Sequence, residues 1–236
     1  YDNGGTVDAN VNWVARQPFH YQTIKRIGEK QLAMWGVASI DFNARLDRSV
    51  AMTFARFQNR SYFYGIGGLQ NYGMLNDPSR ITPIGPDTKA AGGTTWPLAT
   101  ADEEYRDVLK LYSQLQLQMG GNLEMTDRMV LLLSTTRQPM LAKLSPFNVS
   151  VNQMLRENFP NMEIKAAPEM TTGSGELMQL IVPDYEAQET TWLGFTEKMR
   201  AHPVVQELSA WMQKFSGGTW GAIIRRPIAI AQMLGI

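Results

Sequence analysis

A stripe of apolar side chains within residues 41–64 constrains the fold of this chain more than any other feature of its sequence. Successive members are four, four, three and seven positions apart, which places them on one face of an α-helix. The charged residues of the segment lie largely off this face. We therefore predict a long amphipathic helix that buries Leu46, Val50, Phe54, Phe57 and Tyr64.

The segment that follows, residues 65–78, predicts where this helix ends. It contains four glycines and a proline, and such residues end helices and favour turns. Further along, Thr100 and Glu103 have the Thr-x-x-Glu spacing of a capping box. Apolar residues recur behind it at helical spacing, so we expect a second helix of about five turns over residues 101–119.

Shorter apolar runs predict strands and one further helix. Ser150 is expected to open a short helix that Pro160 ends, and Gly217–Gly218 to turn the chain between two strands. Pro227 is expected to interrupt the last strand or to place it at an edge. The predicted strands are Met129–Leu133, Met162–Ala166, Leu177–Val182, Thr191–Phe195, Leu208–Phe215 and Ala222–Met233.

Residues 11–30 alternate between apolar and polar side chains, which is typical of an extended strand. Pro18 interrupts the alternation, as at an edge or a bulge. Trp13, Phe19 and Tyr21 lie on the apolar side, and little neighbouring sequence could cover them. We expect this arm to contact another chain in preference to its own core, because an exposed strand edge invites pairing.

Charge and composition exclude several classes of protein. The chain has 22 basic and 22 acidic residues, whereas proteins that read nucleic acids usually carry a basic surplus. It has no cysteine, which rules out disulfide frameworks and thiolate chemistry. No uncharged apolar run approaches the roughly 20 residues that span a bilayer. A neutral chain can pack closely against copies of itself, because long-range repulsion between the copies is weak.

Residues with chemical function are sparse. The glycines within residues 65–68 lack the third glycine and the preceding strand of a dinucleotide-binding loop. His20 and His202 have no histidine or acidic residue three or four positions away, so neither matches a helical metal-ligand pair. We predict no catalytic residue and no cofactor.

Two clusters of charge have ordinary interpretations. Asp184, Glu186 and Glu189 crowd one segment, but solvated acidic loops are commoner than cation sites, and the spacing is not that of an EF-hand. Arg225–Arg226 is a weak patch for DNA in a neutral chain. We predict no metal site.

Four segments stand out along the chain, and they are spread over nearly its whole length: Asn12–Gln17, Gly68–Pro78, Glu197–Pro203 and Gly217–Ala222. These segments resemble those of one family of phage and prophage major capsid proteins. The order of elements, an extended arm, a long helix, a glycine-rich turn, a second helix and a mixed lobe, also resembles the capsid fold that tailed-phage major capsid proteins share with encapsulins.

The resemblance implies an α+β tailed-phage capsid fold with three parts. Residues 1–33 would be the returning limb of an extended loop that lies over a neighbouring subunit, and the chain would therefore begin inside that loop. Residues 34–124 and 196–219 would form a peripheral domain, with a long spine helix and a sheet. Residues 125–195 and 220–236 would form an axial domain, with a mixed sheet and flanking helices.

The function implied is that of a structural, non-enzymatic major capsid protein. It would assemble as a homo-oligomer of pentamers and hexamers into an icosahedral phage head around double-stranded DNA, which it would hold without sequence readout. Scaffold, portal and maturation protease would be partners, no membrane would be involved, and assembly would take place in the bacterial cytoplasm. The candidate contacts between subunits are Trp13, Arg16, Phe19, Tyr21, Tyr72, Trp192 and Trp220.

Two alternatives stay open from the sequence. An encapsulin-like compartment with enzyme cargo would use the same fold. A hydrolase would require His20 or His202 to lie in a pocket beside a carboxylate and a hydroxyl group.

Overall fold

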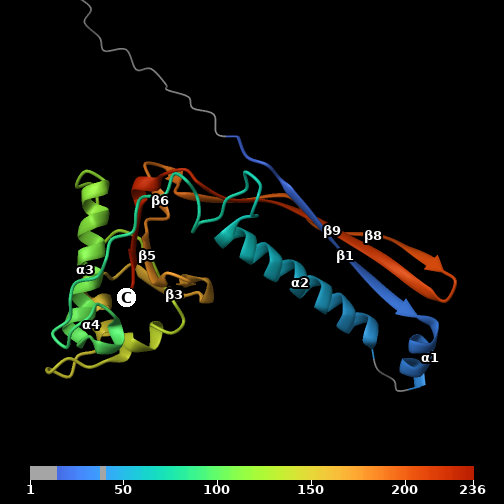
Figure 1. Ribbon diagram of the computed structural model, residues 1–236, viewed down its shortest axis with the longest axis horizontal. Helices are drawn as coiled ribbons and strands as arrows, with labels where there is room; N and C mark the ends of the chain where they lie inside the picture. The colour runs from blue at the N-terminus through green and yellow to red at the C-terminus, as the bar shows by residue number, and fades with distance from the viewer. Residues whose placement is uncertain (1–14, 38–40) are drawn as a thin grey trace, which may run out of the picture.

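Figure 1 shows the computed structural model, in which residues 15–37 and 41–236 are described. A compact lobe and a long arm that projects from it make up the molecule. The helices are α1 (Glu29–Val37), α2 (Phe42–Tyr64), α3 (Ala101–Gln118) and α4 (Val151–Asn158). The strands are β1 (Phe19–Gly28), β2 (Met129–Leu133), β3 (Met162–Ala166), β4 (Thr171–Thr172), β5 (Gly175–Ile181), β6 (Asp184–Tyr185), β7 (Gln188–Glu189), β8 (Thr191–Glu207), β9 (Ala210–Ile224) and β10 (Ile230–Leu234).

The arm is an antiparallel sheet with strand order β1-β9-β8, and α2 lies along one of its faces (Figure 1). Val50 and Phe54 on the apolar stripe of α2 are buried against Phe215 of β9 and the ring of Tyr21 of β1. The amphipathic pattern therefore predicted the helix and the burial of Val50 and Phe54, but Tyr64, which was expected to be buried, is 38% exposed at the end of the helix. The pattern could not predict that the buried face covers the extended N-terminal strand.

The helix starts lie where the capping residues predicted them. Thr100 Oγ1 accepts a hydrogen bond from the Glu103 N–H, and the Glu103 carboxylate accepts one from the Thr100 N–H, so both halves of the capping box are present. Ser150 likewise caps α4 by accepting from the N–H of Gln153. These bonds satisfy N–H groups that have no partner within the helix.

The predicted turn at Gly217–Gly218 is wrong, because both glycines lie within β9 and the hairpin turns at residues 208–209 instead. A Cβ at Gly217 would lie 3.0 Å from a ring carbon of Phe54. A Cβ at Gly218 would lie 1.9 Å from Thr196 Oγ1. The glycines thus leave room for neighbouring side chains, a long-range requirement that a local turn signal does not reveal.

Three strand predictions need correction in their bounds. The strand expected over residues 191–195 continues to Glu207, and the strand expected over residues 208–215 runs from Ala210 to Ile224. The final predicted strand is divided by a short 3-10 helix at Pro227–Ala229, as the proline indicated. In the arm, β1 begins only after Pro18 and gives way to α1 at Glu29, whereas residues 11–14 of the predicted strand lie outside the described residues.

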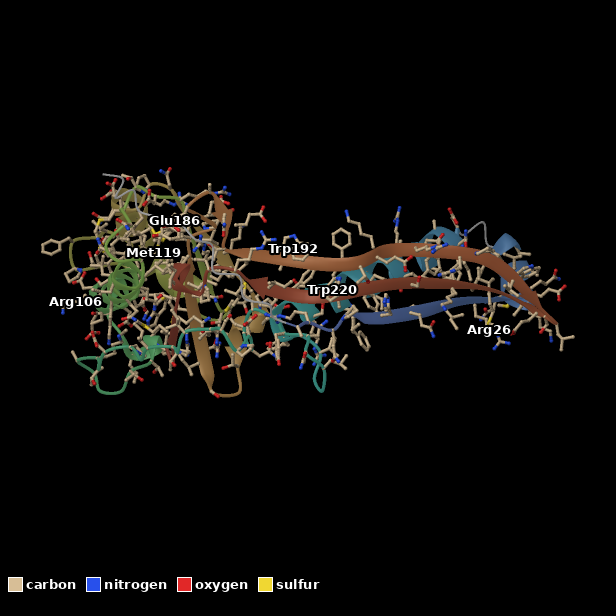
Figure 2. All side chains as sticks on the ribbon, turned by 90° about the horizontal axis from the view of Figure 1, so that it is seen from above. Arg26, Arg106, Met119, Glu186, Trp192 and Trp220 are labelled. Carbon is tan, nitrogen blue, oxygen red and sulfur yellow. The ribbon has the colours of Figure 1, made fainter. Side chains whose placement is uncertain are left out.

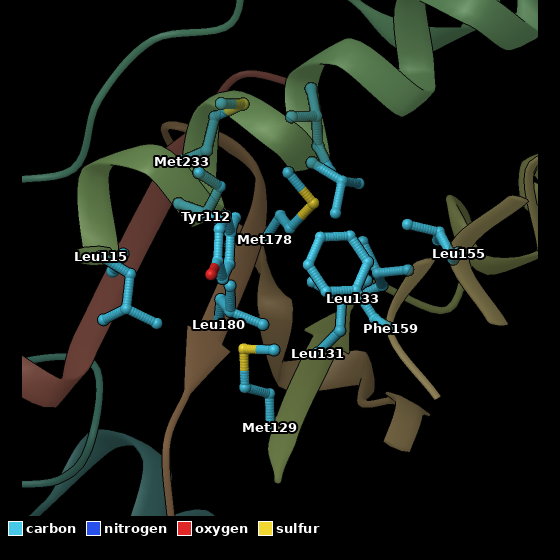
Figure 3. Packing of buried hydrophobic residues seen from close by; sticks show 14 of the residues in the cluster. Tyr112, Leu115, Met129, Leu131, Leu133, Leu155, Phe159, Met178, Leu180 and Met233 are labelled. Atoms are coloured by element: carbon cyan, nitrogen blue, oxygen red, sulfur yellow. The ribbon is translucent and has the colours of Figure 1, made fainter. Parts of the chain in front are cut away.

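The lobe is built on a mixed sheet with strand order β10-β5-β2-β3, and β4 pairs with β5. Strands β2 and β3 are parallel and are connected through α4, whereas β5 pairs antiparallel with both of its neighbours on this path. Figure 3 shows the core between this sheet and helices α3 and α4, where the rings of Tyr112 and Phe159 lie 5.1 Å apart. Leu131, Leu133 and Leu180 are completely buried there.

A second apolar cluster joins the lobe to the arm. It brings Ile181 of β5 and Ile230 of β10 against Ala222 and Ile224 at the lobe end of β9. The long strand β9 therefore contributes to both parts of the molecule (Figure 1). Because the two parts share a strand and a core, the direction in which the arm leaves the lobe is set by packing.

Candidate self-assembly surface

Strand β8 forms one edge of the arm, and its pairing within the described residues is with β9. Such an edge offers unpaired backbone N–H and C=O groups to another chain. The register between β8 and β9 shifts at four places between Gly194 and Val204. Irregularities of this kind increase the twist of a sheet, and Pro203 removes one N–H donor from β8, so both features restrict which strand can pair here.

Exposed apolar side chains follow β8 along its length. In Figure 2 side chains stand out on both sides of this strand from the lobe to the tip. Val204 and Val205 are 57% and 61% exposed, and Leu208 in the turn is completely exposed. A large apolar area on an extended arm is a usual mark of a surface that another protein covers. The exposed apolar residues of β8 and the adjoining turn are Trp192, Leu193, Phe195, Met199, Val204, Val205 and Leu208.

Trp192 and Trp220 lie together where the arm meets the lobe (Figure 2). Both flank Gly194, since a Cβ at that position would stand 2.8 Å from Trp220 Cβ and 3.1 Å from the Trp192 ring. Trp192 is 41% exposed, and Arg225 Cζ lies 5.6 Å from the centroid of its ring. Of the predicted contact residues in the described chain, Trp192 offers an exposed ring of the kind found at interfaces.

Arg16 and Tyr72 contact each other at the base of the arm. Arg16 Cζ lies 4.9 Å from the centroid of the Tyr72 ring, and the guanidinium group also donates a hydrogen bond to Asp77. The Tyr72 carbonyl accepts a hydrogen bond from the N–H of Ala222. These interactions fix the start of the described chain to the glycine-rich turn and to β9.

Phe19 and Tyr21 point toward α2 and are half-buried there. The Tyr21 ring centroid lies 4.2 Å from that of Phe57 and 4.9 Å from that of Phe54, and Phe19 lies 6.0 Å from Phe57. Burial raises the pKa of the Tyr21 hydroxyl. The sequence indicated no cover for these rings, but α2 supplies it. Their role between subunits stays a prediction, and Trp13 lies outside the described residues.

Sequence reasoning missed the apolar residues of the outer half of β8. The strand predicted from the sequence ends at Phe195, and no strand is predicted over residues 196–207. Arg200, Ala201, His202 and Pro203 lie between Met199 and the adjacent Val204 and Val205, so the segment has no clean alternation. The signal that could have found them is the long gap between two predicted strands, which is typical of an extended hairpin limb.

His202 does lie beside a hydroxyl group, and that hydroxyl lies beside a carboxylate. Its Nε2 is 2.9 Å from Ser216 Oγ, and Ser216 donates a hydrogen bond of 2.9 Å to Glu197. In a hydrolytic triad the histidine lies between the serine and the carboxylate and removes the serine proton. Here the serine proton is committed to Glu197, so the three residues make a cross-strand polar network and not an activated nucleophile.

An ion pair between Arg226 and Glu186 joins the two charged clusters. Asp184 and Glu189 face each other across the small hairpin of β6 and β7, and Arg226 lies 3.3 Å from Glu186 at its tip. Within residues 15–37 and 41–236, no group of three or more histidine and acidic side chains is arranged to hold a metal ion. The helices of the same residues include none with the length and apolarity that crossing a bilayer requires.

Solved structures identify the architecture. The capsid of Myoviridae phage XM1 superposes with a TM-score of 0.76 at 14% identity, over 94% of this chain and 74% of that one. The capsid of an empty GTA particle gives a TM-score of 0.60 at 9% identity, over 92% and 71% of the two chains. Mycobacterium phage Ogopogo gives 0.57 at 8% identity, over 94% and 76%. The fold is therefore that of tailed-phage major capsid proteins, as the sequence resemblance implied.

A family model defines the chain further. The model described as Pa193 gp26 major capsid protein matches residues 1–235. The chain belongs to this family of phage major capsid proteins. It is a structural, non-enzymatic protein that associates with itself in the capsid of the virion. No curated protein sequence matches it significantly, and neither the encapsulin-like nor the hydrolase alternative is favoured.

Proposed function

We propose that this protein forms the pentamers and hexamers of an icosahedral head that encloses double-stranded DNA. The balance of 22 basic and 22 acidic residues supports a shell that encloses DNA without reading its sequence. Assembly in the cytoplasm of the bacterial host, with a scaffold, a portal and a maturation protease as partners, completes the proposal.

The observation that carries this proposal is the exposed apolar edge of β8. An arm that projects from a lobe can reach a neighbouring subunit, and β8 offers that subunit both apolar side chains and unpaired backbone groups. Such a contact joins different surfaces of two neighbouring subunits. Contacts of this kind form a closed ring when the rotation from one subunit to the next is a whole fraction of a full turn. Many such contacts hold a shell together even when each one is moderate.

The packing supports one change to the proposed division into domains. Residues Val108, Leu111 and Leu115 of α3 are buried in the lobe core with β2 and β5. We assign α3 to the axial domain for this reason, whereas the boundary at residues 124/125 would place it with α2. The peripheral domain then consists of α2 with the arm sheet, and β1 provides the returning limb of the extended loop.

The experiment compares shell formation by the complete protein with that of two β8 variants. Val204→Asp and Phe195→Asp each place a charge within the exposed apolar surface. We expect both variants to form capsid shells at less than a tenth of the wild-type yield, because an unpaired charge buried between subunits costs several kcal/mol. Electron microscopy counts the shells, and circular dichroism checks that the subunits are folded.

Gln206→Asp is the matched control. It adds the same charge to the same exposed strand but removes no apolar surface. We expect this variant to assemble like the wild type. Shells from Val204→Asp and Phe195→Asp at wild-type yield would overturn the role of β8, and equal loss with Gln206→Asp would show that charge anywhere on the arm is responsible.

A further inference from the structure

Lys89 and Asp107 face each other inside the lobe. Lys89 Nζ lies 2.5 Å from Asp107 Oδ2, and the two side chains are 2% and 1% exposed. Asp107 belongs to α3, whereas Lys89 lies on the loop that leads to this helix. An amine and a carboxyl group are therefore held in contact in a site that excludes water.

The loop holds Lys89 in a defined position. The Lys89 N–H donates to the Gly93 carbonyl at 2.8 Å, and the Gly92 N–H donates to the Lys89 carbonyl at 2.9 Å. Two such bonds close a tight turn around the lysine backbone. Holding two reactive groups in a fixed orientation raises their effective concentration by many orders of magnitude over free solution.

Both oxygens of the Asp107 carboxyl group accept hydrogen bonds. The indole N–H of the buried Trp96 donates to Oδ2 at 2.8 Å, and the backbone N–H of Asp87 donates to Oδ1 at 3.4 Å. Donors placed in this way withdraw electron density from the carboxyl carbon and stabilise negative charge that develops on oxygen. The carbon is therefore prepared for attack by a neutral amine.

Glu104 supplies a carboxyl group that can carry protons. It precedes Asp107 by one turn of α3, on the same face, and is completely buried. Its Oε1 accepts a hydrogen bond of 2.6 Å from Lys143, whereas its buried Oε2 has no hydrogen-bond partner among the described residues. Burial, with a smaller contribution from the charge of Asp107, raises the Glu104 pKa, so this carboxyl group binds a proton more readily than an exposed one.

We propose that Lys89 and Asp107 condense to an intramolecular isopeptide bond. Proton transfer from the Lys89 ammonium to the Asp107 carboxylate gives a neutral amine and a carboxylic acid. The amine lone pair attacks Asp107 Cγ, Glu104 takes a proton from the nitrogen and gives it to the departing oxygen, and one water molecule leaves. The product is a secondary amide between Nζ and Cγ, and no oxidant, reductant or cofactor is consumed.

The surroundings favour the product over the ion pair. A buried ion pair has a desolvation cost that its mutual attraction often fails to repay. Condensation replaces both charges by a neutral amide. Because the site is buried, the released water does not readily return, and hydrolysis of the amide is disfavoured. The bond would tie the loop before α3 to the helix, and this inference is independent of how subunits assemble.

The test is mass spectrometry on the purified complete protein. We expect an intact mass lower than that of the sequence by one water molecule. Combined digestion after Lys, Arg and Glu residues should give a branched species that joins residues 81–103 to residues 107–110. The intervening residues 104–106 are removed by this digestion, so no linear peptide has the same composition.

Variants and an internal control make each outcome decisive. Lys89→Gln should restore the full mass, and Glu104→Gln, if folded by circular dichroism, should lose the branched species at least tenfold. Lys110 Nζ also lies 2.5 Å from a carboxylate, that of Asp87, but on the surface, so no link should form there. A full-mass wild-type protein overturns the bond, an equally linked Lys110 overturns the role of burial, and a linked Glu104→Gln variant overturns the role of Glu104.

Discussion

Arg16 donates a hydrogen bond from Nη2 to Oδ2 of Asp77 at 2.6 Å, and the two side chains are only 9% and 0% exposed. Asp77 also accepts hydrogen bonds from the hydroxyl and the N–H of Ser79 on its other oxygen. The pair connects the segment before β1 to the end of the glycine-rich turn. A buried pair of this kind specifies a position more than it adds stability, because desolvation offsets much of the attraction.

Removing the carboxylate alone should strongly destabilise the protein. Asp77→Ala leaves the Arg16 guanidinium group buried without its partner, and breaking one half of such a pair costs about 3–5 kcal/mol. Urea denaturation of unassembled subunits measures the free energy of unfolding. Asp87→Ala is the control, because it breaks an exposed pair with Lys110, and it should cost at most about 1 kcal/mol. Equal losses in the two variants would contradict the importance of burial.

Asp77 should also make the free energy of unfolding depend on pH in the acid range. Burial alone would raise the pKa of Asp77, but hydrogen bonds from Ser79 and Arg16 outweigh it and hold the pKa below its ordinary value. A carboxyl group with a lowered pKa in the folded state stabilises the protein above its unfolded pKa of about 3.9, and this contribution is lost as the pH falls through the folded value.

Asp77→Asn should therefore flatten the acid side of the stability profile. As the pH falls below the unfolded pKa and through the lowered folded value, the wild type loses the Asp77 contribution, whereas the variant has none to lose. Urea midpoints measured at several pH values for both proteins give the difference. Parallel profiles for the two proteins would show that Asp77 titrates alike in the folded and unfolded states.

The sequence predicted the elements whose determinants are local. Thr100 with Glu103, and Ser150 before its helix, place helix starts through bonds that span three residues, so the pattern alone is sufficient. Gly217 is different. A glycine is needed at this position of β9 because the ring of Phe54, in another element, lies close to it. A rule based on neighbouring residues alone interprets two adjacent glycines as a turn.

The candidate surface was predicted only in part, for the same reason. Trp192, one of the candidate contacts between subunits, is exposed. Tyr21 was named because no nearby sequence could cover it, yet α2 covers it from a position more than thirty residues away. Exposure along β8 depends on the strand order β1-β9-β8, which leaves this strand at the edge, and strand order is a property of the whole fold.

Loss of the capping box should weaken α3. Thr100→Ala removes the hydroxyl that accepts from the Glu103 N–H, and such a change costs about 0.5–2 kcal/mol. Thermal unfolding of unassembled subunits measures the shift. Thr100→Ser keeps the hydroxyl group and should unfold within about 0.5 kcal/mol of the wild type. A loss in Thr100→Ser as large as in Thr100→Ala would attribute the effect to the methyl group.

Two leucines, one buried and one exposed, show how far the cost of a Leu→Ala substitution depends on burial. Leu131 on β2 is completely buried in the lobe core shown in Figure 3, whereas Leu117 on α3 is 77% exposed. Leu131→Ala should lower the free energy of unfolding by about 2–5 kcal/mol, because it removes apolar contacts and leaves a cavity. Leu117→Ala should change it by no more than about 0.5 kcal/mol. Similar losses in urea denaturation would place Leu117 in a packed environment.

Gly221 is a position at the base of the arm where a side chain should be poorly tolerated. Its φ is +73°, and a Cβ there would lie 2.3 Å from the Tyr72 carbonyl oxygen, which accepts the hydrogen bond from Ala222. Gly221→Ala should cost about 1–3 kcal/mol from backbone strain alone, and more if that hydrogen bond breaks. The control is Gly67→Ala, where a Cβ would meet open space, with an expected change within about 0.5 kcal/mol. Because β9 joins the lobe to the arm here, Gly221→Ala should also lower the yield of shells, and unchanged stability would show that Tyr72 and β9 can separate without loss.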